Sequence, residues 1–265
     1  MKAMFLATLI RAGRSLRRRP GSSAAVVLTL GLGIAVSTAV FTLAEAVLFR
    51  KLPYRDADRI VALQNRTGEG QAAGISWQDA RDLAAARSFD VTAVYSKRTW
   101  ALSDSTGQPL EVVLSGMVTQ GFFTALGVEP EWGEPFVARY EHPGGNRVVW
   151  LSHALWQRRY NGQPQAARSY LSLNSVSYRI AGVLPAWFRF PIDGENPDLY
   201  LPLDETAYCC ARNARETGGL ARIAPGVPSG KARAELRVLS ARLGQAHPET
   251  NRSVRFEAVN LQEAL

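Results

Sequence analysis

The side chains that most often carry chemistry are few in this sequence, and they are not spaced as catalytic or metal-binding motifs. None of the three histidines, His142, His153 and His247, has a second His or Cys at the spacing of zinc ligands. Ser152 precedes His153, but neighbours at a helix start point in different directions, and Ser152 is a typical helix-capping residue. No G-x-S-x-G elbow, no H-E-x-x-H helix and no evident carboxylate pair is present. The sequence therefore points to no catalytic residue and no metal site.

The sequence also lacks a phosphate-binding loop. The nearest string, Gly226–Ala232, has three residues between its glycines instead of four, and Ala232 stands where a hydroxyl would bind Mg²⁺. We interpret this string as a turn followed by a surface helix that Ser229 caps. No cofactor is therefore expected on this chain.

The two cysteines are neighbours, Cys209 and Cys210, which excludes a small domain stapled by several disulfides. Outside the cytoplasm such a pair can close a strained ring, bridge to another chain or stay as two free thiols. The sequence leaves these three states open.

Charge is distributed unevenly along the 265 residues. Lys and Arg number 31 against 23 Asp and Glu, which gives a net charge of +8. Residues 1–51 carry eight of the basic groups and one acidic group, so the remainder is nearly neutral. Because nucleic-acid binding depends on neutralising phosphates, we expect no nucleic-acid partner.

The basic surplus lies beside a long uncharged run. Pro20–Ala44 is 25 residues without a charge, and roughly 20 apolar residues cross a bilayer. We predict a single transmembrane helix over residues 20–49, surrounded by membrane lipid. Five arginines precede it and place the N-terminus in the cytoplasm, with the bulk of the chain beyond the membrane. They are Arg11, Arg14, Arg17, Arg18 and Arg19.

Residues 1–19 combine basic residues with an apolar helical face, which favours an interfacial helix on the cytoplasmic leaflet over a frayed tail. A cleaved signal peptide is the alternative to an anchor, because Ala44-Glu45-Ala46 has the A-x-A form of a cleavage site. The uncharged run is longer than the roughly 7–15 residues typical of a signal peptide, so we favour a retained anchor.

Small residues recur at four-residue spacing within the predicted span. Gly31 and Ala35 form one such pair, and Gly33 and Ser37 form another. This spacing lets a partner helix pack closely in lipid. Ordinary use of Gly and Ser in an apolar helix explains the same pattern.

The rest of the sequence mixes strand and helix patterns. Strands are predicted over residues 59–65, 89–96, 99–103, 110–118, 147–151, 169–173, 176–183, 199–201, 220–223 and 254–259. Helices are predicted over residues 77–86, 120–126, 153–160 and 229–246, with Ser76, Ser152 and Ser229 as N-caps. Residues 206–219 are predicted to be a polar, mobile loop. The mixed order indicates an α+β fold in which a sheet packs on helices.

Strings along most of the chain resemble the permeases of MacB-type ABC transporters, and most closely the duplicated orphan group common in acidobacteria. Leu28–Tyr54 is similar to the first membrane helix of the family and the A-x-x-x-R-x-L-P-Y pattern that follows it. The later strings that carry the resemblance are Ile75–Leu83 (ISWQDARDL), Gly121–Val128 (GFFTALGV), Arg147–Tyr160 (RVVWLSHALWQRRY), Val176–Pro191 (VSYRIAGVLPAWFRFP), Leu220–Leu243 and His247–Arg252.

The resemblance implies a MacB-like periplasmic core domain over residues 50–265. A porter-like lobe (about 55–118 and 219–262) would carry an inserted second lobe (about 119–218). The chain would be the N-terminal part of a non-catalytic permease in a bacterial inner membrane. It would couple ATP-driven motion of membrane helices to the periplasmic domain, for export or mechanotransmission.

The resemblance also implies partners, because no nucleotide-binding segment is present. These are a cytoplasmic ABC ATPase that binds ATP, further permease helices or a second permease copy, and a periplasmic adaptor. The alternative is an anchored binding or scaffold module that acts alone, and the presence of partner helices decides between the two. An anchored enzyme would need a pocket with perturbed titratable groups, which a sequence does not reveal.

Overall fold

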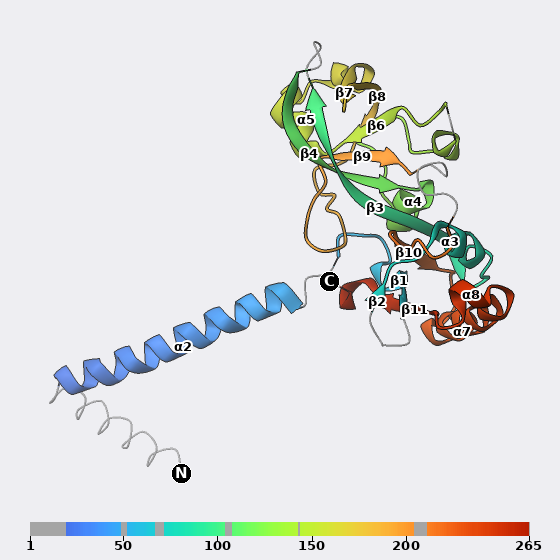
Figure 1. Ribbon diagram of the computed structural model, residues 1–265. Coiled ribbons are helices and arrows are strands. Elements are labelled where there is room, and N and C mark those ends of the chain that lie inside the picture. Colours follow the sequence, from blue (N-terminus) through green and yellow to red (C-terminus); the bar gives the residue numbers. More distant parts are fainter. Residues whose placement is uncertain are drawn as a thin grey trace. The chain divides into compact units, whose positions relative to one another are not determined.

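The computed structural model describes residues 20–48, 52–66, 72–103, 108–142, 144–203 and 211–264 (Figure 1). The chain forms two compact units, which are residues 1–51 and residues 52–265. The predicted interfacial helix of residues 1–19, with its five arginines, and the Cys209-Cys210 pair lie outside the described residues.

The N-terminal unit contains the helix α2 (Pro20–Leu48). Side chains described on α2 are exposed, including Leu28 and Phe41. Over the described ranges, no helix is both long enough and apolar enough to cross a membrane. That residues 20–49 cross a membrane stays a prediction.

A mixed sheet organises the second unit, and in the described residues it has 11 strands (Figure 1). Their order is β11-β1-β10-β3-β4-β9-β6-β8-β5, with β2 beside β1 and β7 beside β3 and β8. The strands are β1 (Ile60–Arg66), β2 (Ala72–Ala73), β3 (Phe89–Ser103), β4 (Pro109–Val118), β5 (Trp132–Gly133), β6 (Val148–Leu151), β7 (Tyr170–Leu173), β8 (Val176–Val183), β9 (Leu199–Pro202), β10 (Gly218–Ile223) and β11 (Arg255–Asn260).

Short helices and 3₁₀ turns connect the strands. The helices are α3 (Trp77–Leu83), α4 (Gln120–Leu126), α5 (His153–Tyr160), α7 (Ser229–Ala246) and α8 (Pro248–Asn251). The 3₁₀ turns are η1 (Ala57–Arg59), η2 (Ala138–Glu141), η3 (Pro164–Arg168) and η4 (Leu261–Glu263).

The 15-residue strand β3 joins the two parts of the sheet. Its first half, Phe89–Tyr95, pairs with β10, and its second half, Tyr95–Ser103, pairs with β4. The first part, β11-β1-β10-β3, is antiparallel throughout. In the second part β4 pairs with β9 and β6 pairs with β8 in parallel.

The second part closes on itself. The chain of pairings β3-β4-β9-β6-β8-β7 returns to β3, where Leu173 of β7 lies opposite Leu102. Closure of a sheet removes the unpaired edges that would otherwise invite association. Leu102, Leu173 and Ile180 from this ring are fully buried.

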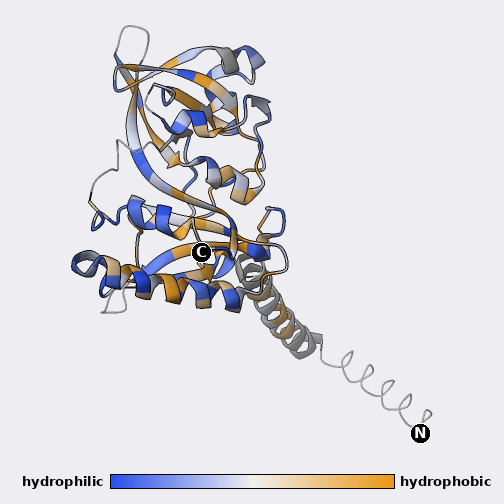
Figure 2. Ribbon diagram, turned by 90° about the vertical axis from the view of Figure 1, so that its right-hand side faces the viewer, coloured by the Kyte–Doolittle hydropathy of each residue, from blue (hydrophilic) through white to orange (hydrophobic). Residues whose placement is uncertain are grey.

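Apolar side chains form two clusters. One contains the inward residues of α7, such as Leu236 and Leu243, together with Leu83 of α3 and Leu102 of the ring. Figure 2 shows α7 with hydrophobic and hydrophilic segments alternating along its length, as expected of a helix with one face on the sheet. The other cluster is rich in aromatic residues and contains α4 and the residues around Phe188.

Most of the predicted elements are confirmed to within a few residues. The hairpin turn Asn174-Ser175 has φ values of 48° and 65°, as a tight two-residue turn between β7 and β8 requires. Gly127 ends α4 with φ 67°. The boundary between two lobes stays a prediction, since residues 52–265 form one compact unit.

Four details of the prediction were wrong. Residues 89–96 and 99–103 belong to one continuous strand, because backbone pairing with β4 runs through the polar Lys97-Arg98 step. Helix α3 ends at Leu83 instead of Ala86. Residues 127–145, for which no helix or strand is predicted, contain β5 and η2. Pro228 is the N-cap of α7 and Ser229 its first helical residue, so Ser229 does not cap it.

Candidate functional site

The domain begins and ends at one place. Residues 52–59 lead into β1, and η4 follows β11, which pairs with β1 so that Val61 lies opposite Asn260. Leu52 and Ala264, at the two ends of this unit, pack against the same buried cluster, which includes Tyr54 and Leu261. The first and the last described residues of this unit therefore lie against the same part of the core.

Tyr54 ties the start of the domain to a distant segment. Its side chain is buried, and its hydroxyl donates a hydrogen bond to the carbonyl oxygen of Arg189. Its ring lies 6.4 Å from that of Trp187 and 6.5 Å from that of Phe188. Burial raises the pKa of Tyr54 well above its usual value, so the hydroxyl stays a donor. Because Arg189 lies 135 residues further on, this contact is a tertiary clamp on residues 187–189.

Aromatic rings continue from this clamp into the closed part of the sheet. The ring of Phe188 lies 5.5 Å from that of Tyr200 in β9 and 5.8 Å from that of Phe123 in α4. Phe123 lies 5.6 Å from Phe136, which lies 4.4 Å from Trp150 in β6. Rings at these separations pack favourably, and a closely packed interior transmits displacement.

A second cluster surrounds a buried carboxylate. Asp79 of α3 is fully buried, and its Oδ1 accepts hydrogen bonds from Arg212 Nη1 and Asn251 Nδ2, both at 2.8 Å. Arg215 Nη2 lies 3.3 Å from the other carboxylate oxygen, and Arg212 also binds Asp82 at 2.6 Å. Two guanidinium groups thus neutralise the buried charge, as burial of a carboxylate demands.

The Asp79 cluster holds the segment before β10. Part of the predicted mobile loop, residues 211–217, lies in the described ranges, and it is fixed by Arg212, Arg215 and the pairing of Thr217 with Ile75. No local pattern in the sequence identifies the two arginines, because their shared partner Asp79 lies more than 130 residues away.

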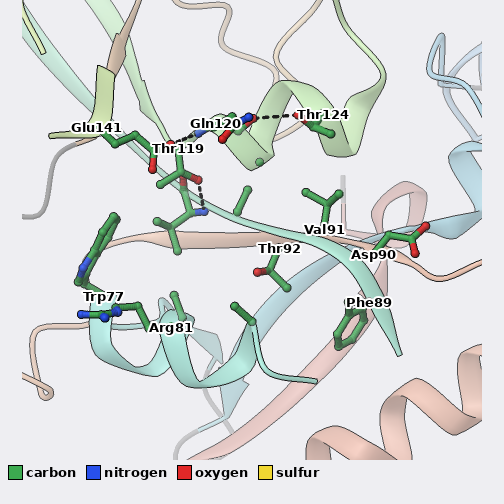
Figure 3. Close-up of a pocket in the computed structure, with 15 residues that line it drawn as sticks. Trp77, Arg81, Phe89, Asp90, Val91, Thr92, Thr119, Gln120, Thr124 and Glu141 are labelled. Atoms are coloured by element: carbon green, nitrogen blue, oxygen red, sulfur yellow. Dashed lines mark hydrogen bonds between the residues drawn. The ribbon is translucent and has the colours of Figure 1, made fainter. Parts of the chain in front are cut away.

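A groove of about 530 Å³ runs beside the first half of β3 (Figure 3). Helix α3 borders it with Trp77 and Arg81, and the start of α4 borders it with Gln120 and Thr124. Among the described strands, only β10 pairs with Val91–Ala93, and these residues line the groove along their other edge.

Glu141 lies at one end of the groove and accepts a hydrogen bond from the backbone N–H of Gln120. Burial raises the pKa of Glu141. The groove brings together hydroxyl, amide and carboxyl groups but no nucleophile held by a base. Within the described residues, no group of three or more His, Cys, Asp or Glu side chains is placed to hold a metal ion.

Ser152 and His153 do not form a catalytic pair. Ser152 Oγ accepts a hydrogen bond from Leu155 N at 3.1 Å, which confirms the predicted cap of α5. His153 Nδ1 lies 3.2 Å from Glu131 Oε2 instead.

A comparison of the chain with protein families matches the MacB-like periplasmic core domain over residues 23–239. The chain belongs to this family. The match begins inside α2 and ends inside α7, so it contains both Tyr54 and the Asp79–Arg212 pair.

Solved structures of MacB-like domains share the fold. The periplasmic region of MacB from Actinobacillus actinomycetemcomitans has a TM-score of 0.58 at 14% identity, with 78% of this chain and 91% of that chain covered. A domain of a putative permease from Porphyromonas gingivalis has a TM-score of 0.58 at 14% identity, with coverages of 79% and 92%.

The extracellular domain of the noncanonical ABC-type transporter YknZ from Gram-positive bacteria is also similar. Its TM-score is 0.54 at 10% identity, with 75% of this chain and 99% of that chain covered. No curated protein matches this chain in sequence.

The strings that resemble MacB-type permeases meet in pairs in this member of the family. Tyr54 closes the first string and clamps Arg189 of Val176–Pro191. Asp79 of Ile75–Leu83 binds Asn251 of His247–Arg252. The strings therefore correspond to tertiary contacts that hold distant segments together.

The described structure does not test the residues assigned to topology and helix packing. Arg11, Arg14, Arg17, Arg18 and Arg19 lie outside the described residues. Gly31, Gly33, Ala35 and Ser37 are exposed on α2, and a Cβ added to either glycine would meet nothing within 4 Å. Their role in helix packing stays a prediction.

Proposed function

We propose that this chain is the N-terminal part of an ABC-type permease, in which α2 anchors a periplasmic domain that responds to motion of the membrane helices. The family match over residues 23–239 carries this proposal. The packing of Leu52 and Ala264 against one cluster is consistent with it, because a domain inserted between two membrane helices needs both of its ends on the membrane side.

The Tyr54 clamp is the proposed coupling element. Displacement of the chain just before Leu52 would pull on Tyr54, and through its hydrogen bond and ring contacts on residues 187–189. From Phe188 the aromatic rings continue to β9 and β6. A close-packed path of this kind moves as a unit instead of deforming continuously.

The proposed topology follows the charges of the sequence. Arg11, Arg14, Arg17, Arg18 and Arg19 would hold the N-terminus in the cytoplasm of a bacterium, and residues 50–265 would lie in the periplasm. Gly31, Gly33, Ala35 and Ser37 would face further permease helices or a second permease copy.

The energy source in this proposal lies on a separate subunit. A cytoplasmic ABC ATPase would bind and hydrolyse ATP, and a periplasmic adaptor would contact the domain. The domain itself would be non-catalytic and serve export or mechanotransmission.

Purification of the tagged protein from its native membranes tests this function. We expect an ABC ATPase to co-purify in a fixed ratio and to hydrolyse ATP in the recovered complex. Carbonate washing should leave the chain in the membrane fraction. Recovery of the chain without any ATPase would contradict the permease function and favour the anchored scaffold.

A further inference from the structure

Trp187 is a large aromatic side chain that the domain leaves in solvent. It lies between β8 and β9, and 45% of its surface is exposed although the neighbouring Phe188 is buried. Its ring lies at the edge of the Tyr54 ring, 6.4 Å away, so its position is tied to the start of the domain.

One cationic side chain, that of Arg189, is held beside Trp187, and a second, that of Arg55, lies at the start of the domain. Arg189 is exposed, and its Nη1 donates to the carbonyl oxygens of Ala186 and Phe188, both at 2.8 Å, which fixes the guanidinium beside the backbone of Trp187. Arg55, next to Tyr54, is exposed as well. No carboxylate of the described residues pairs with either arginine, in contrast to Arg66, Arg139 and Arg158.

The covalent chain limits how far this surface can lie from the proposed anchor. Tyr54 is five residues beyond the end of the predicted span at residue 49. An extended chain covers at most about 3.6 Å per residue, so Tyr54 stays within about 18 Å of that end. The interfacial layer is where Trp is enriched in membrane proteins and where Arg meets lipid phosphates.

We infer that Trp187 and Arg189, together with Arg55 at the start of the domain, contact lipid in the headgroup layer of an anionic bilayer. The indole N–H and ring suit a layer that is polar on one side and apolar on the other. The unpaired guanidinium groups suit phosphate oxygens. This inference rests on the proposed anchor, and it adds a membrane contact made by the domain itself.

A protein partner fits the surface less well. Trp187 is a single exposed ring beside the cationic Arg189, whereas protein interfaces have an apolar core in which charge is depleted. The lipid is therefore the proposed occupant of this surface.

Quenching by brominated lipid tests the contact. The full chain is reconstituted in liposomes of phosphatidylcholine and phosphatidylglycerol, with bromine on the upper part of the acyl chains. We expect part of the fluorescence of the six tryptophans to be quenched. Trp187→Phe should abolish most of the quenching, and Trp132→Phe, at a residue of equal exposure on β5, should leave most of it.

The charges are tested in the same liposomes. Arg189→Gln together with Arg55→Gln should reduce the quenching at least twofold when phosphatidylglycerol is present. Added salt should do the same in the unchanged protein. The Arg55 substitution leaves its backbone carbonyl, which accepts from Arg222 Nη2, in place.

Each outcome decides the inference. Quenching that survives in Trp187→Phe, or that falls equally in Trp132→Phe, overturns it and leaves the anchor standing. A chain that floats with liposomes but shows no quenching overturns the lipid contact and leaves the anchor standing. A chain that does not float overturns both the inference and the anchor. Circular dichroism of each variant excludes misfolding, and bromine placed deeper in the acyl chains should quench less in the unchanged protein.

Discussion

Asn251 donates a hydrogen bond from its side-chain amide to Oδ1 of Asp79 at 2.8 Å, and both side chains are fully buried. This contact joins α3 to α8 across 172 residues of sequence. Arg212 shares the same carboxylate oxygen, so three distant segments meet at one buried charge. The fold of this part of the sheet therefore depends on a polar cluster as well as on apolar packing.

Asp79→Asn should strongly destabilise the domain. The change removes the buried negative charge, which takes from Arg215 its carboxylate partner among the described residues and leaves Arg212 with Asp82 alone. Breaking one partner of a buried ion pair costs about 3–5 kcal/mol. Urea unfolding of the full chain in detergent, followed by circular dichroism, measures the loss.

Asp82→Asn is the matched control. Asp82 binds the same Arg212 at 2.6 Å, but its side chain is 37% exposed. Exposed ion pairs contribute at most about 1 kcal/mol, so the control should unfold near the unchanged protein. Equal losses in the two variants would show that burial of Asp79 is not what makes the cluster stabilising.

Gly121→Ala should destabilise the junction of α4 and β3. A Cβ at this position would lie closer to the carbonyl oxygen of Thr92 than van der Waals contact permits. The clash is with backbone, which cannot rotate away, and overpacking of this kind costs about 1–3 kcal/mol.

Gly230→Ala is the opposite case. A Cβ on Gly230, in the first turn of α7, would meet nothing within 4 Å. Replacing a helical glycine with alanine stabilises by about 0.5–1 kcal/mol. The melting temperature should thus decrease for Gly121→Ala and increase for Gly230→Ala. A change of the same sign in both variants would contradict this account.

The sequence was sufficient for most elements because their signals are local. Gly127 ends α4 through its left-handed backbone, and Asn174-Ser175 turn the chain because both adopt positive φ. The prediction that Ser229 is the N-cap of α7 was wrong because Pro228, whose φ is −66°, occupies the extended N-cap position and Ser229 is already helical. The prediction divided β3 into two strands because the polar residues in its middle interrupt the apolar alternation. In the structure the hydrogen bonds to β4 continue through these residues.

The candidate site could not be predicted in the same way. Tyr54 stands in a recognisable string, but no spacing reveals that its hydroxyl reaches Arg189. Arg212 and Arg215 lie in a polar stretch that composition alone assigns to a loop. Contacts between segments more than 100 residues apart depend on the topology of the sheet, which local pattern does not determine.

Alkaline pH should destabilise the domain. Burial is the main cause that raises the pKa values of Tyr54, Tyr95 and Tyr200 above the usual 10.0. In the unfolded chain these phenols ionise near pH 10, while in the folded domain they stay protonated to a higher pH. The folded state then binds more protons, so stability is complete below pH 10 and falls as the pH rises above it.

Thermal unfolding between pH 8 and pH 12 measures this effect. Above pH 10, the melting temperature of a variant with Phe at all three positions should decrease less than that of the unchanged protein. A control Tyr170→Phe, at a residue that is 66% exposed, should follow the unchanged protein. If the melting temperatures of the triple variant and the unchanged protein decrease in parallel with pH, the three buried tyrosines are not the cause of the alkaline destabilisation.

Gly31→Leu should weaken the assembly of the permease. If Gly31 and Ala35 face a partner helix, a large side chain separates the two backbones and removes close contacts that drive packing in lipid. Leu28→Ile, at a position 71% exposed on the same helix, is the control. Recovery of the tagged complex from mild detergent is measured for each variant.

Tyr54→Phe tests the coupling directly. The variant keeps the ring contacts with Trp187 and Phe188 and loses the hydrogen bond to Arg189, which stabilises by about 0.5–1.5 kcal/mol. We therefore expect a small loss of stability, faster hydrogen exchange in residues 187–190 and weaker coupling between ATP hydrolysis and motion of the domain. Spin labels on the domain, compared with and without ATP in the purified complex, report that motion. An ATP-dependent change of unchanged size in Tyr54→Phe, together with faster exchange, would show that the clamp stabilises the domain without carrying motion into it.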